Sequence, residues 1–558
     1  MGIKLSNVYT FDFETNNSLQ AIESGYTYVW LWDICAVSTF KHRFGLSMDS
    51  FMRTLTDLSK KDNIVAYSHN LKFDGSFVLD YLLNNGFVWD EELKSSKTFT
   101  CVIDTRLVFY SITFNTGYNT VELRDSLKKI PSSVEEIAKA WKLPILKGEI
   151  DYRLDRPKGY IPSDEELAYI NNDTEIVARV LRDLYKDGMN CLTASADALK
   201  SFKKSIGGLD MFNLIYPQLS LEVDDFIRQA YTGGVCMVAP KYKGVELHDV
   251  YCYDVNSMYP SVMLQQLLPY GVPVYYKGKY EEDKAYPLFI QHLKVCMKVK
   301  DGKYPSVMRR VMFRVNNEYI EDTGVDMIEL YLSTPDYNLM LDQYDIYDIE
   351  YIDGYKFKAS NKIFEKYITT NYELKCNNTG AIKQLAKLRL NSLYGKFASN
   401  PRRTTIQPYI DENGIVKFSV LNHYLVDPIY TAVSVFTTAY AHVKLFDAIE
   451  HNHDIFVYCD TDSIHTVGKA KDIPIDEQLI GAWKEEKYYY DFKALAQKCY
   501  MGIGEKTYIK VAGAPKKVKE QISYDEFDFG RTYSGKLAPK RVKGGTVLMD
   551  TTFTFKER

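Results

Sequence analysis

Two widely separated sets of acidic residues constrain this chain more than any other feature of its sequence. The first set lies near the N-terminus and comprises Asp12, Glu14, Asp74 and Asp173. The second set lies past the midpoint and comprises Asp254, Asp460 and Asp462. Carboxylates two residues apart in a strand point to the same side and repel each other unless a cation lies between them. Each set therefore predicts a site for two divalent metal ions, which favours phosphate chemistry at two places, one making and one breaking a phosphodiester bond.

The length and charge of the chain bound its organisation and its partners. At 558 residues it is too long for a single core, so two to four domains are expected. The net charge of −4 argues weakly against nucleic-acid binding, but residues 498–558 carry 13 basic and 7 acidic side chains. Residues 374–410 contain seven basic side chains and no acidic one. Such segments suit a polyanion, although an ordinary solvated surface accounts for them equally well.

Cysteine usage and hydropathy indicate the compartment. The nine cysteines are scattered without a C-x-x-C pair, which favours a reducing cytoplasm. The first ten residues contain no apolar core of the signal-peptide type, and no apolar run reaches the roughly 18 residues of a membrane span. We therefore expect neither a signal peptide nor a transmembrane segment.

Hydrophobic periodicity separates an N-terminal α/β region from a longer remainder. Residues 1–190 alternate strand-like and helix-like segments, which predicts an α/β domain. Within it, Glu165–Tyr185 has a strong amphipathic pattern, with Ser163 as N-cap and Glu166 completing a capping box. The remainder is predicted to contain a strand at Val250–Asp254, a basic helix at Gly380–Phe397, a hairpin around Gly414 and a hairpin over Ile455–Val467.

The neighbours of the first carboxylate set offer groups suited to a hydrolytic site. The segment His69–Asp74 supplies amide, aromatic and carboxylate groups within six residues. Tyr169 and Asp173 are four residues apart in the predicted helix and so face the same way, where the tyrosine hydroxyl could orient a metal-bound water. Taken singly, Asp12 and Glu14 fit a solvated strand edge and Tyr169 fits core packing, but together they favour hydrolysis.

The second set has a basic complement. If the strand that ends at Asp254 lies beside the 455–467 hairpin, the carboxylates meet on one sheet edge, where two ions could bridge a triphosphate and a primer hydroxyl. One face of the predicted basic helix carries Lys383, Lys387, Asn391 and Tyr394. Lysines one turn apart can hold a triphosphate, although a solvated Lys-rich face is the common alternative.

The segments around both sets resemble known motifs. The three motifs of the proofreading 3′–5′ exonuclease fold are matched by FDFET, HNLKFD and YINND. The motifs of B-family DNA polymerases are matched by YDVNSMYP, KLRLNSLYG, YCDTDS and the K-x-Y of 498–500, and the linking motif by YTGG at 231–234. Segments such as SHNLKFDGSF, LKGEID and YCDTDSIH further resemble the protein-primed enzymes of small tailed bacteriophages of the phi-twenty-nine type.

The resemblance implies a multidomain fold of α/β plus α+β class. An RNase H-like 3′–5′ exonuclease domain is followed by a right-hand polymerase domain with palm, fingers, thumb and two insertions. The implied ranges are 1–190 for the exonuclease, 191–264 and 432–510 for the palm, 265–362 for the terminal-protein insertion, 363–397 for the fingers, 398–431 for the strand-displacement insertion and 511–558 for the thumb. The first insertion is implied to contact a priming terminal protein. The second is implied to close a ring around DNA and support strand displacement.

The resemblance also implies roles for residues in the exonuclease half. The four carboxylates of the first set become the metal ligands, Tyr169 positions the nucleophilic water, and Lys147 assists catalysis. Contacts to single-stranded DNA are implied for Thr15, His69, Asn70, Phe73, Ser126, Leu127 and Tyr152.

Roles in the polymerase half follow in the same way. Asp254 and Asp462 become the principal metal ligands, assisted by the Val255 carbonyl, with Asp460 in the same cluster. Nucleotide contacts are implied for Tyr259, Lys375, Lys383, Lys387, Asn391 and Tyr394, with Tyr259 as the steric gate that excludes a 2′-hydroxyl. DNA contacts are implied for Tyr231, Gly233, Gly234, Ser257, Lys498 and Tyr500.

The implied function is that of a replicative DNA-directed DNA polymerase with protein priming, strand displacement and proofreading. Its cofactor would be Mg²⁺, two ions per site, with Mn²⁺ as a substitute. Its partners would be primer-template and single-stranded DNA, dNTPs and a terminal protein, and it would act as a monomer in the cytoplasm of a bacterial host. Two alternatives stay open: a conventional DNA-primed repair polymerase of the same family, and a catalytically inactive nucleic-acid-binding scaffold.

Two positions depart from the implied pattern. In FTTAYAH, His442 stands where an arginine is expected, and histidine is mostly neutral at pH 7, which puts one implied phosphate contact in question. The segment Gly502–Val511 is also short for the group, so a shortened thumb with an altered grip on DNA is expected.

Overall fold

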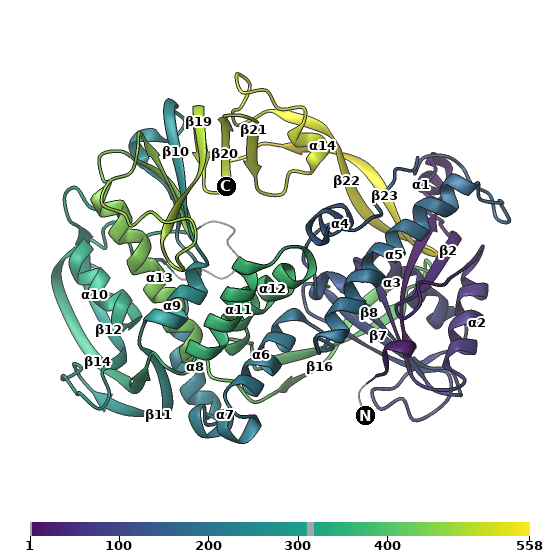
Figure 1. Cartoon of the computed structure of the whole chain (residues 1–558), viewed down its shortest axis with the longest axis horizontal. Coiled ribbons are helices and arrows are strands. Elements are labelled where there is room, and N and C mark those ends of the chain that lie inside the picture. Colours follow the sequence, from purple (N-terminus) through teal and green to yellow (C-terminus); the bar gives the residue numbers. More distant parts are fainter. Residues whose placement is uncertain (1–2, 310–316, 558) are drawn as a thin grey trace.

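The chain forms two large bodies that lie side by side, one purple and blue and one teal and green, joined by a yellow C-terminal hairpin (Figure 1). The computed structural model describes residues 3–309 and 317–557. Within these ranges, no helix combines the length and the apolar character needed to cross a bilayer.

The N-terminal body is built on an eight-stranded mixed sheet with the order β3-β2-β1-β4-β8-β7-β6-β5. Its strands are β1 (Val8–Thr15), β2 (Val29–Ala36), β3 (His42–Gly45), β4 (Ile64–Ser68), β5 (Val88–Trp89), β6 (Thr98–Ile103), β7 (Phe109–Asn115) and β8 (Thr120–Asp125). Its helices are α1 (Leu19–Ser24), α2 (Met48–Ser59), α3 (Leu71–Asn84), α4 (Val134–Trp141) and α5 (Asp164–Lys186). Strand β1 lies inside the sheet, antiparallel to β2 and parallel to β4, so its acidic residues belong to the interior of the domain.

Helix α5 begins and ends where its sequence indicates. The Ser163 hydroxyl accepts from the Glu166 N–H, and the Glu166 carboxylate accepts from the Ser163 N–H, which completes the predicted capping box. One face of the helix buries Ile170, Val177 and Leu181. Because Tyr169 and Asp173 lie on this buried side, the amphipathic pattern itself carries them against β1.

The second body contains a seven-stranded sheet with the order β21-β20-β19-β10-β18-β17-β9, which we call the palm sheet after the domain predicted for this part of the chain. Its strands are β9 (Cys236–Val238), β10 (Glu246–Val255), β17 (Phe456–Asp460), β18 (Ser463–Val467), β19 (Trp483–Ala496), β20 (Cys499–Ile503) and β21 (Thr507–Val511). The helices around it are α6 (Ala194–Ser205), α7 (Leu209–Ile215), α8 (Leu221–Gln229), α9 (Met258–Gln265), α11 (Glu365–Asn377), α12 (Gly380–Phe397) and α13 (Ala432–His451). Helix α12 has the bounds predicted from the sequence.

Three further units complete the chain. The first insertion is a four-stranded sheet formed by β11 (Leu268–Lys277), β14 (Tyr344–Ser360), β12 (Leu288–Val299) and β13 (Ile328–Ser333), with α10 (Thr334–Gln343) against it. The second is the hairpin of β15 (Arg402–Ile410) and β16 (Val416–Leu425). The C-terminal segment contains α14 (Lys516–Lys519) and the hairpin of β22 (Thr532–Val542) and β23 (Gly545–Thr554).

Both hairpins are held by the N-terminal body. A two-stranded hairpin is marginally stable on its own, so it needs such packing. Ile406 and Val416 of the β15–β16 hairpin are buried in the same apolar core as Phe11 and Phe51. Strand β23 lies against α1 and α3, where Asn17 Oδ1 accepts from the Leu548 N–H at 2.6 Å (Figure 1).

Candidate active sites

The first carboxylate set lines one cavity of about 560 Å³ in the N-terminal body. Nearly all the residues predicted for the exonuclease site lie there: Asp12, Glu14, Thr15, His69, Asn70, Phe73, Asp74, Lys147, Tyr152, Tyr169 and Asp173. They come from β1, from the junction of β4 and α3, from α5 and from the segment before it. Four carboxylates from distant parts of the sequence therefore line one cavity.

Burial and mutual repulsion disfavour the ionised form of these carboxylates. Burial, followed by the charges of Asp74, Glu14 and Asp173, raises the pKa of Asp12 well above its usual value. Burial and the charge of Asp173 raise the pKa of Glu14 to about 8. Burial likewise raises the pKa of Asp74 to about 7, against the lowering effect of its hydrogen bond from Ser68. A cation placed among them would relieve this cost.

Two contacts organise the cavity. Lys147 Nζ donates to Asp173 Oδ2 at 2.6 Å, while the buried Asp173 Oδ1 has no hydrogen-bond partner in the described part of the chain. The hydroxyls of Tyr152 and Tyr169 lie 2.8 Å apart, which fixes the tyrosine that faces Asp173 and Glu14. The unmatched acceptor on Asp173, beside the carboxylates of β1, suits a hard cation.

The metal fit rests on carboxylate pairs. Across residues 3–309 and 317–557, no three His, Cys, Asp or Glu side chains are arranged as a ready-made metal cage. Magnesium in phosphoryl-transfer sites is usually held by one or two carboxylates, with water and substrate phosphate completing its shell. Asp12 with Glu14 in one body, and Asp254 with Asp462 in the other, match that requirement.

Two predicted exonuclease residues do not line the cavity. Ser126 is fully buried, and its hydroxyl lies 2.8 Å from His69 Nδ1 and donates to the Ser68 carbonyl at 3.0 Å. Leu127 follows it in a short 3₁₀ turn. Ser126 therefore holds His69 in place, and its expected contact with DNA stays a prediction.

Other cavity residues had no signal in the local sequence. Asn17, Leu537 and Leu548 also line the space, and the two leucines come from the C-terminal hairpin. Only the packing of β22 and β23 on the N-terminal body brings them there. The C-terminal hairpin therefore forms part of the wall of this cavity.

The second carboxylate set meets on the palm sheet. Asp254 on β10 and Asp460 on β17 are both register partners of Ser463 on the intervening strand β18. The Asp462 carbonyl accepts from the Val255 N–H at 2.8 Å, so the predicted strand and hairpin are joined at the turn. Burial, followed by the charge of Asp254, raises the pKa of Asp462 to about 7.

Two lysines lie beside these carboxylates. Lys484 Nζ is 3.8 Å from Asp254, and Lys498 Nζ is 3.9 Å from Asp460. Lys498 belongs to the predicted K-x-Y motif, whereas Lys484 was not predicted. The antiparallel register of β10 with β19 pairs Lys484 with Asp254, a relation that no local pattern reveals.

The predicted nucleotide residues surround the same edge of the palm. The rings of Tyr259 on α9 and Tyr394 on α12 stack with their centres 4.1 Å apart. Lys375 donates to the Ser257 hydroxyl at 2.7 Å. Burial and the charge of Lys383 lower the pKa of Lys387, and burial lowers the pKa of Lys375. The charged forms of these lysines are therefore disfavoured, and a bound anion would stabilise them. Asn391 is exposed on the same helix.

The remaining predicted DNA residues lie along the palm. The charge of the nearby Tyr394, after burial, raises the pKa of Tyr231 to about 12. Tyr500 packs its ring 5.1 Å from Tyr458, whose hydroxyl accepts from the Lys498 N–H at 3.1 Å. The K-x-Y segment is therefore fixed on the strand that carries Asp460.

The Y-x-G-G loop lies directly on the carboxylate turn. A Cβ at Gly234 would lie 2.7 Å from the Thr461 hydroxyl, so a side chain there would displace the turn between Asp460 and Asp462. The Thr461 N–H donates to the Val235 carbonyl at 2.7 Å, and Thr461 itself is in a left-handed conformation with φ 62°. The turn and the loop thus fix each other.

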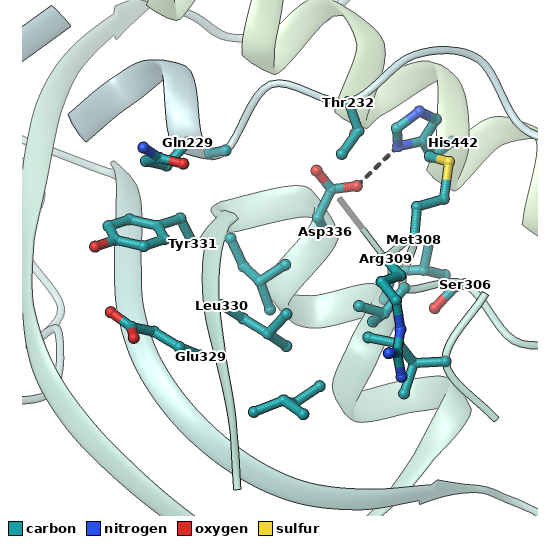
Figure 2. Close-up of a pocket in the computed structure, with 16 residues that line it drawn as sticks. Gln229, Thr232, Ser306, Met308, Arg309, Glu329, Leu330, Tyr331, Asp336 and His442 are labelled. Atoms are coloured by element: carbon teal, nitrogen blue, oxygen red, sulfur yellow. Dashed lines mark hydrogen bonds and ion pairs between the residues drawn. The ribbon is translucent and has the colours of Figure 1, made fainter. Parts of the chain in front are cut away.

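His442, which stands where an arginine was expected, is buried inside the protein. It is 3% exposed, and its ring lies between Asp336 of the first insertion and the Gly233 carbonyl. Figure 2 shows Asp336 directed at the adjacent His442, and both line a cavity to which Thr232 and Arg309 also contribute. A buried side chain is not placed to contact a DNA phosphate, which agrees with the doubt raised about that contact, and the ring is held instead between two acceptors.

The sequence matches the family of type B DNA polymerases of organelles and viruses over residues 55–162 and 154–478. The DNA polymerase of Bacillus phage phi29 is 38% identical, over 98% of this chain and 99% of that protein. The DNA polymerase of Streptococcus phage Cp-1 is 34% identical, over 98% of each.

Solved structures agree with these sequence matches. Phi29 DNA polymerase in an orthorhombic crystal form has a TM-score of 0.93 at 38% identity, with 98% of this chain and 100% of that chain covered. The same enzyme with primer-template DNA and incoming nucleotide substrates has a TM-score of 0.91 at 38% identity, with the same coverage. The expected multidomain fold, with exonuclease and polymerase domains, is therefore confirmed. The chain belongs to the type B DNA polymerases of organelles and viruses, within the group of the phi29-type phage DNA polymerases.

Proposed function

We propose that this DNA polymerase begins synthesis on a terminal protein, displaces the non-template strand, and proofreads at a separate 3′–5′ exonuclease site. The observation that carries the proposal is the gathering of two carboxylate sets at two places on one chain, 12–173 in one body and 254–462 in the other. Phi29 DNA polymerase has been solved with primer-template DNA, single-stranded DNA and incoming nucleotides. We propose the same ligands for this chain.

At the polymerase site, the protein residues would position the nucleotide and the primer and neutralise the charge of the triphosphate. Asp254 and Asp462 would hold Mg²⁺, which when bound neutralises the triphosphate and activates the primer hydroxyl. Lys375, Lys383 and Lys387 would hold the triphosphate, because their ammonium groups repel one another and a bound anion would relieve that repulsion. The stacked Tyr259 would lie under the sugar and exclude a 2′-hydroxyl.

At the exonuclease site, the protein residues orient a water and a phosphodiester. Asp12, Glu14, Asp74 and Asp173 would hold Mg²⁺ there as well. The Tyr169 hydroxyl, fixed by Tyr152, would direct a water molecule at the terminal phosphate. Lys147, held by Asp173, would neutralise the charge that develops on the leaving oxygen.

Paired variants test the two sites, and each serves as the other's control. Asp254→Asn and Asp462→Asn should each reduce Mg²⁺-dependent primer extension by about 1,000-fold or more while primer degradation continues. Asp12→Ala with Glu14→Ala should abolish degradation while extension continues. Loss of both activities in either variant would contradict two separate sites.

Protein priming and strand displacement need their own assays. Transfer of dAMP to a purified cognate terminal protein tests the first, and synthesis on a primed circle with and without that protein tests the second. Failure of the transfer, with normal extension of a DNA primer, would favour the conventional DNA-primed polymerase instead.

A further inference from the structure

One guanidinium outside the β15–β16 hairpin holds both of its legs. Arg228, in the last turn of α8, donates from Nη1 to the Ala398 carbonyl at 2.8 Å and from Nη2 to the Ser399 carbonyl at 3.2 Å. Its Nη2 also donates to the Thr431 hydroxyl at 2.7 Å. The first two groups lie where the chain enters the insertion, and the third lies where it returns to α13. A single side chain therefore joins the two ends of the insertion.

A buried carboxylate fixes this guanidinium. Asp224, one turn earlier in α8, is completely buried, and its Oδ2 accepts from Arg228 Nε and Nη2 at 3.2 and 2.9 Å. Its Oδ1 accepts from the Thr431 hydroxyl at 2.6 Å. The hydroxyl thus donates to one partner and accepts from the other. Because the ion pair is shielded from solvent, its charges are little screened by salt, and the planar fork of arginine suits several acceptors at fixed angles.

The rest of the hairpin is held at a different place. Arg402, the first residue of β15, makes an exposed two-pronged contact with Asp225 at 2.7 and 2.6 Å. Further out, Ile406 and Val416 are buried in the core of the N-terminal body. The hairpin is therefore held at two places, by polar contacts at its base and by apolar packing on the N-terminal body further along.

The base anchor also continues into the polymerase site. The Arg228 carbonyl accepts from the Tyr231 N–H at 3.1 Å, at the start of the Y-x-G-G loop. Gly234 of that loop packs against Thr461. The direction in which the hairpin leaves the palm is thus tied, through one short segment, to the carboxylate turn.

We propose that Arg228 is a positioning residue for strand displacement, which sets the angle of the 398–431 hairpin relative to the palm. This inference rests on the proposed role of that hairpin in separating strands. A hairpin pushed against a duplex bears a load across its base, and legs held by one rigid fork cannot splay. Synthesis on an open template places no such load on it and does not need the anchor.

Two templates distinguish the roles. Arg228→Met and Arg228→Lys would be assayed for primer extension on an open single-stranded template and on the same template with a downstream strand annealed. We expect extension of the open template within about twofold of the parent, since the carboxylates and nucleotide pocket are untouched. On the blocked template we expect a loss of about tenfold for Arg228→Met and an intermediate loss for Arg228→Lys, which keeps the charge beside Asp224 but not the fork. Arg106→Met, an exposed arginine paired with Asp104, is the matched control.

Further outcomes and two further variants separate the role of Arg228 from the role of the hairpin. Equal losses on the two templates, or none on the blocked one, would overturn the role of Arg228. If Arg228→Met fails to fold, Thr431→Val is the substitute test, because it removes one contact at the base of the hairpin with little change of volume. It should give a smaller loss of extension, confined to the blocked template. Replacing 409–417 with a two-glycine turn tests the hairpin itself. If the shortened hairpin still displaces strands, the proposed function of the insertion is wrong. If the shortened hairpin cannot displace strands but Arg228→Met can, the hairpin keeps its proposed function and only the role of Arg228 is wrong.

Discussion

The imidazole ring of His442 is held against the carboxylate of Asp336, with Nδ1 2.9 Å from Oδ1, and its Nε2 lies 2.6 Å from the Gly233 carbonyl. A carboxylate and a carbonyl both accept hydrogen bonds, so both ring nitrogens must carry protons. Burial lowers the pKa of His442, but the charge and hydrogen bond of Asp336 and the Gly233 carbonyl outweigh it and raise the pKa above its usual value. The protonated ring of His442 thus carries a positive charge, as the expected arginine would, but this charge pairs with Asp336 inside the protein.

This pair predicts a pH-dependent contribution to stability. Because the pKa of His442 is higher in the folded protein than in the unfolded chain, its contribution is complete below about pH 6.5 and declines as the pH rises through the folded value. Glu329 and Arg309 are the other charged residues that line this cavity. His442→Gln should therefore lower the thermal midpoint most at pH 6, by an amount equivalent to about 1.5–3 kcal/mol, and least at pH 9.5.

The control for this prediction lies on the same helix. His451 is exposed at the end of α13, and His451→Gln should leave the midpoint nearly unchanged at every pH. Asp336→Asn should move the pH dependence to lower values, because it removes the charge that holds the ring protonated. A His442→Gln effect of constant size between pH 6 and 9.5 would mean that the ring is neutral in the folded protein.

The stacked tyrosines predict sugar discrimination. Tyr259 lies with its ring 4.1 Å from that of Tyr394, so it cannot move aside to admit a 2′-hydroxyl. Tyr259→Val should increase the kcat/KM for a ribonucleotide relative to its deoxyribonucleotide by about 100-fold, equivalent to about 2.7 kcal/mol. Tyr394→Phe keeps the ring stack and should leave the ratio within about twofold. An unchanged ratio in the valine variant would exclude Tyr259 as the gate.

Local rules were enough to predict several elements. The capping box at Ser163 and Glu166, and the bounds of α12, are contained in a few consecutive residues, because capping and helical periodicity depend on neighbours in sequence. The carboxylate sets were predictable for a different reason. Strand alternation aligned Asp12 with Glu14, and the resemblance supplied the long-range convergence that alternation alone cannot give.

Contacts between distant segments were not predictable in the same way. Ser126 is turned inward to His69, 57 residues away, and Leu548 reaches the exonuclease cavity from the far end of the chain. His442 is buried by an insertion whose Asp336 lies 106 residues earlier. Each depends on how whole elements pack, and a residue type at one position does not encode it. The expected effect of a shortened thumb on DNA grip stays a prediction.

A buried ion pair between the two bodies predicts a large effect on stability. Lys129 follows β8 and Asp197 lies in α6; both side chains are fully buried and bonded to each other, and Lys129 also donates to the Cys191 carbonyl at 2.8 Å. Lys129→Met leaves the Asp197 carboxylate buried without its cation, which should cost about 3–5 kcal/mol. Adding Asp197→Leu should recover most of that loss. Thermal and denaturant unfolding measure both, with the exposed Lys139→Met as a control.

The last prediction concerns the contact between the two hairpins. Arg541 of β22 lies with its guanidinium carbon 4.4 Å from the ring centre of Phe418 on β16, and burial lowers the pKa of Arg541. The C-terminal hairpin and the β15–β16 hairpin therefore touch through a partly sheltered cation–π contact worth about 0.5–2 kcal/mol. Arg541→Ala should weaken this closure and shorten the products made in one binding event on a primed circle, while single-nucleotide incorporation stays within about twofold. The exposed neighbour Lys540→Ala should change neither. Shorter products from both variants would instead indicate a general loss of charge attraction to DNA, and unchanged products from Arg541→Ala would show that the contact does not retain the template.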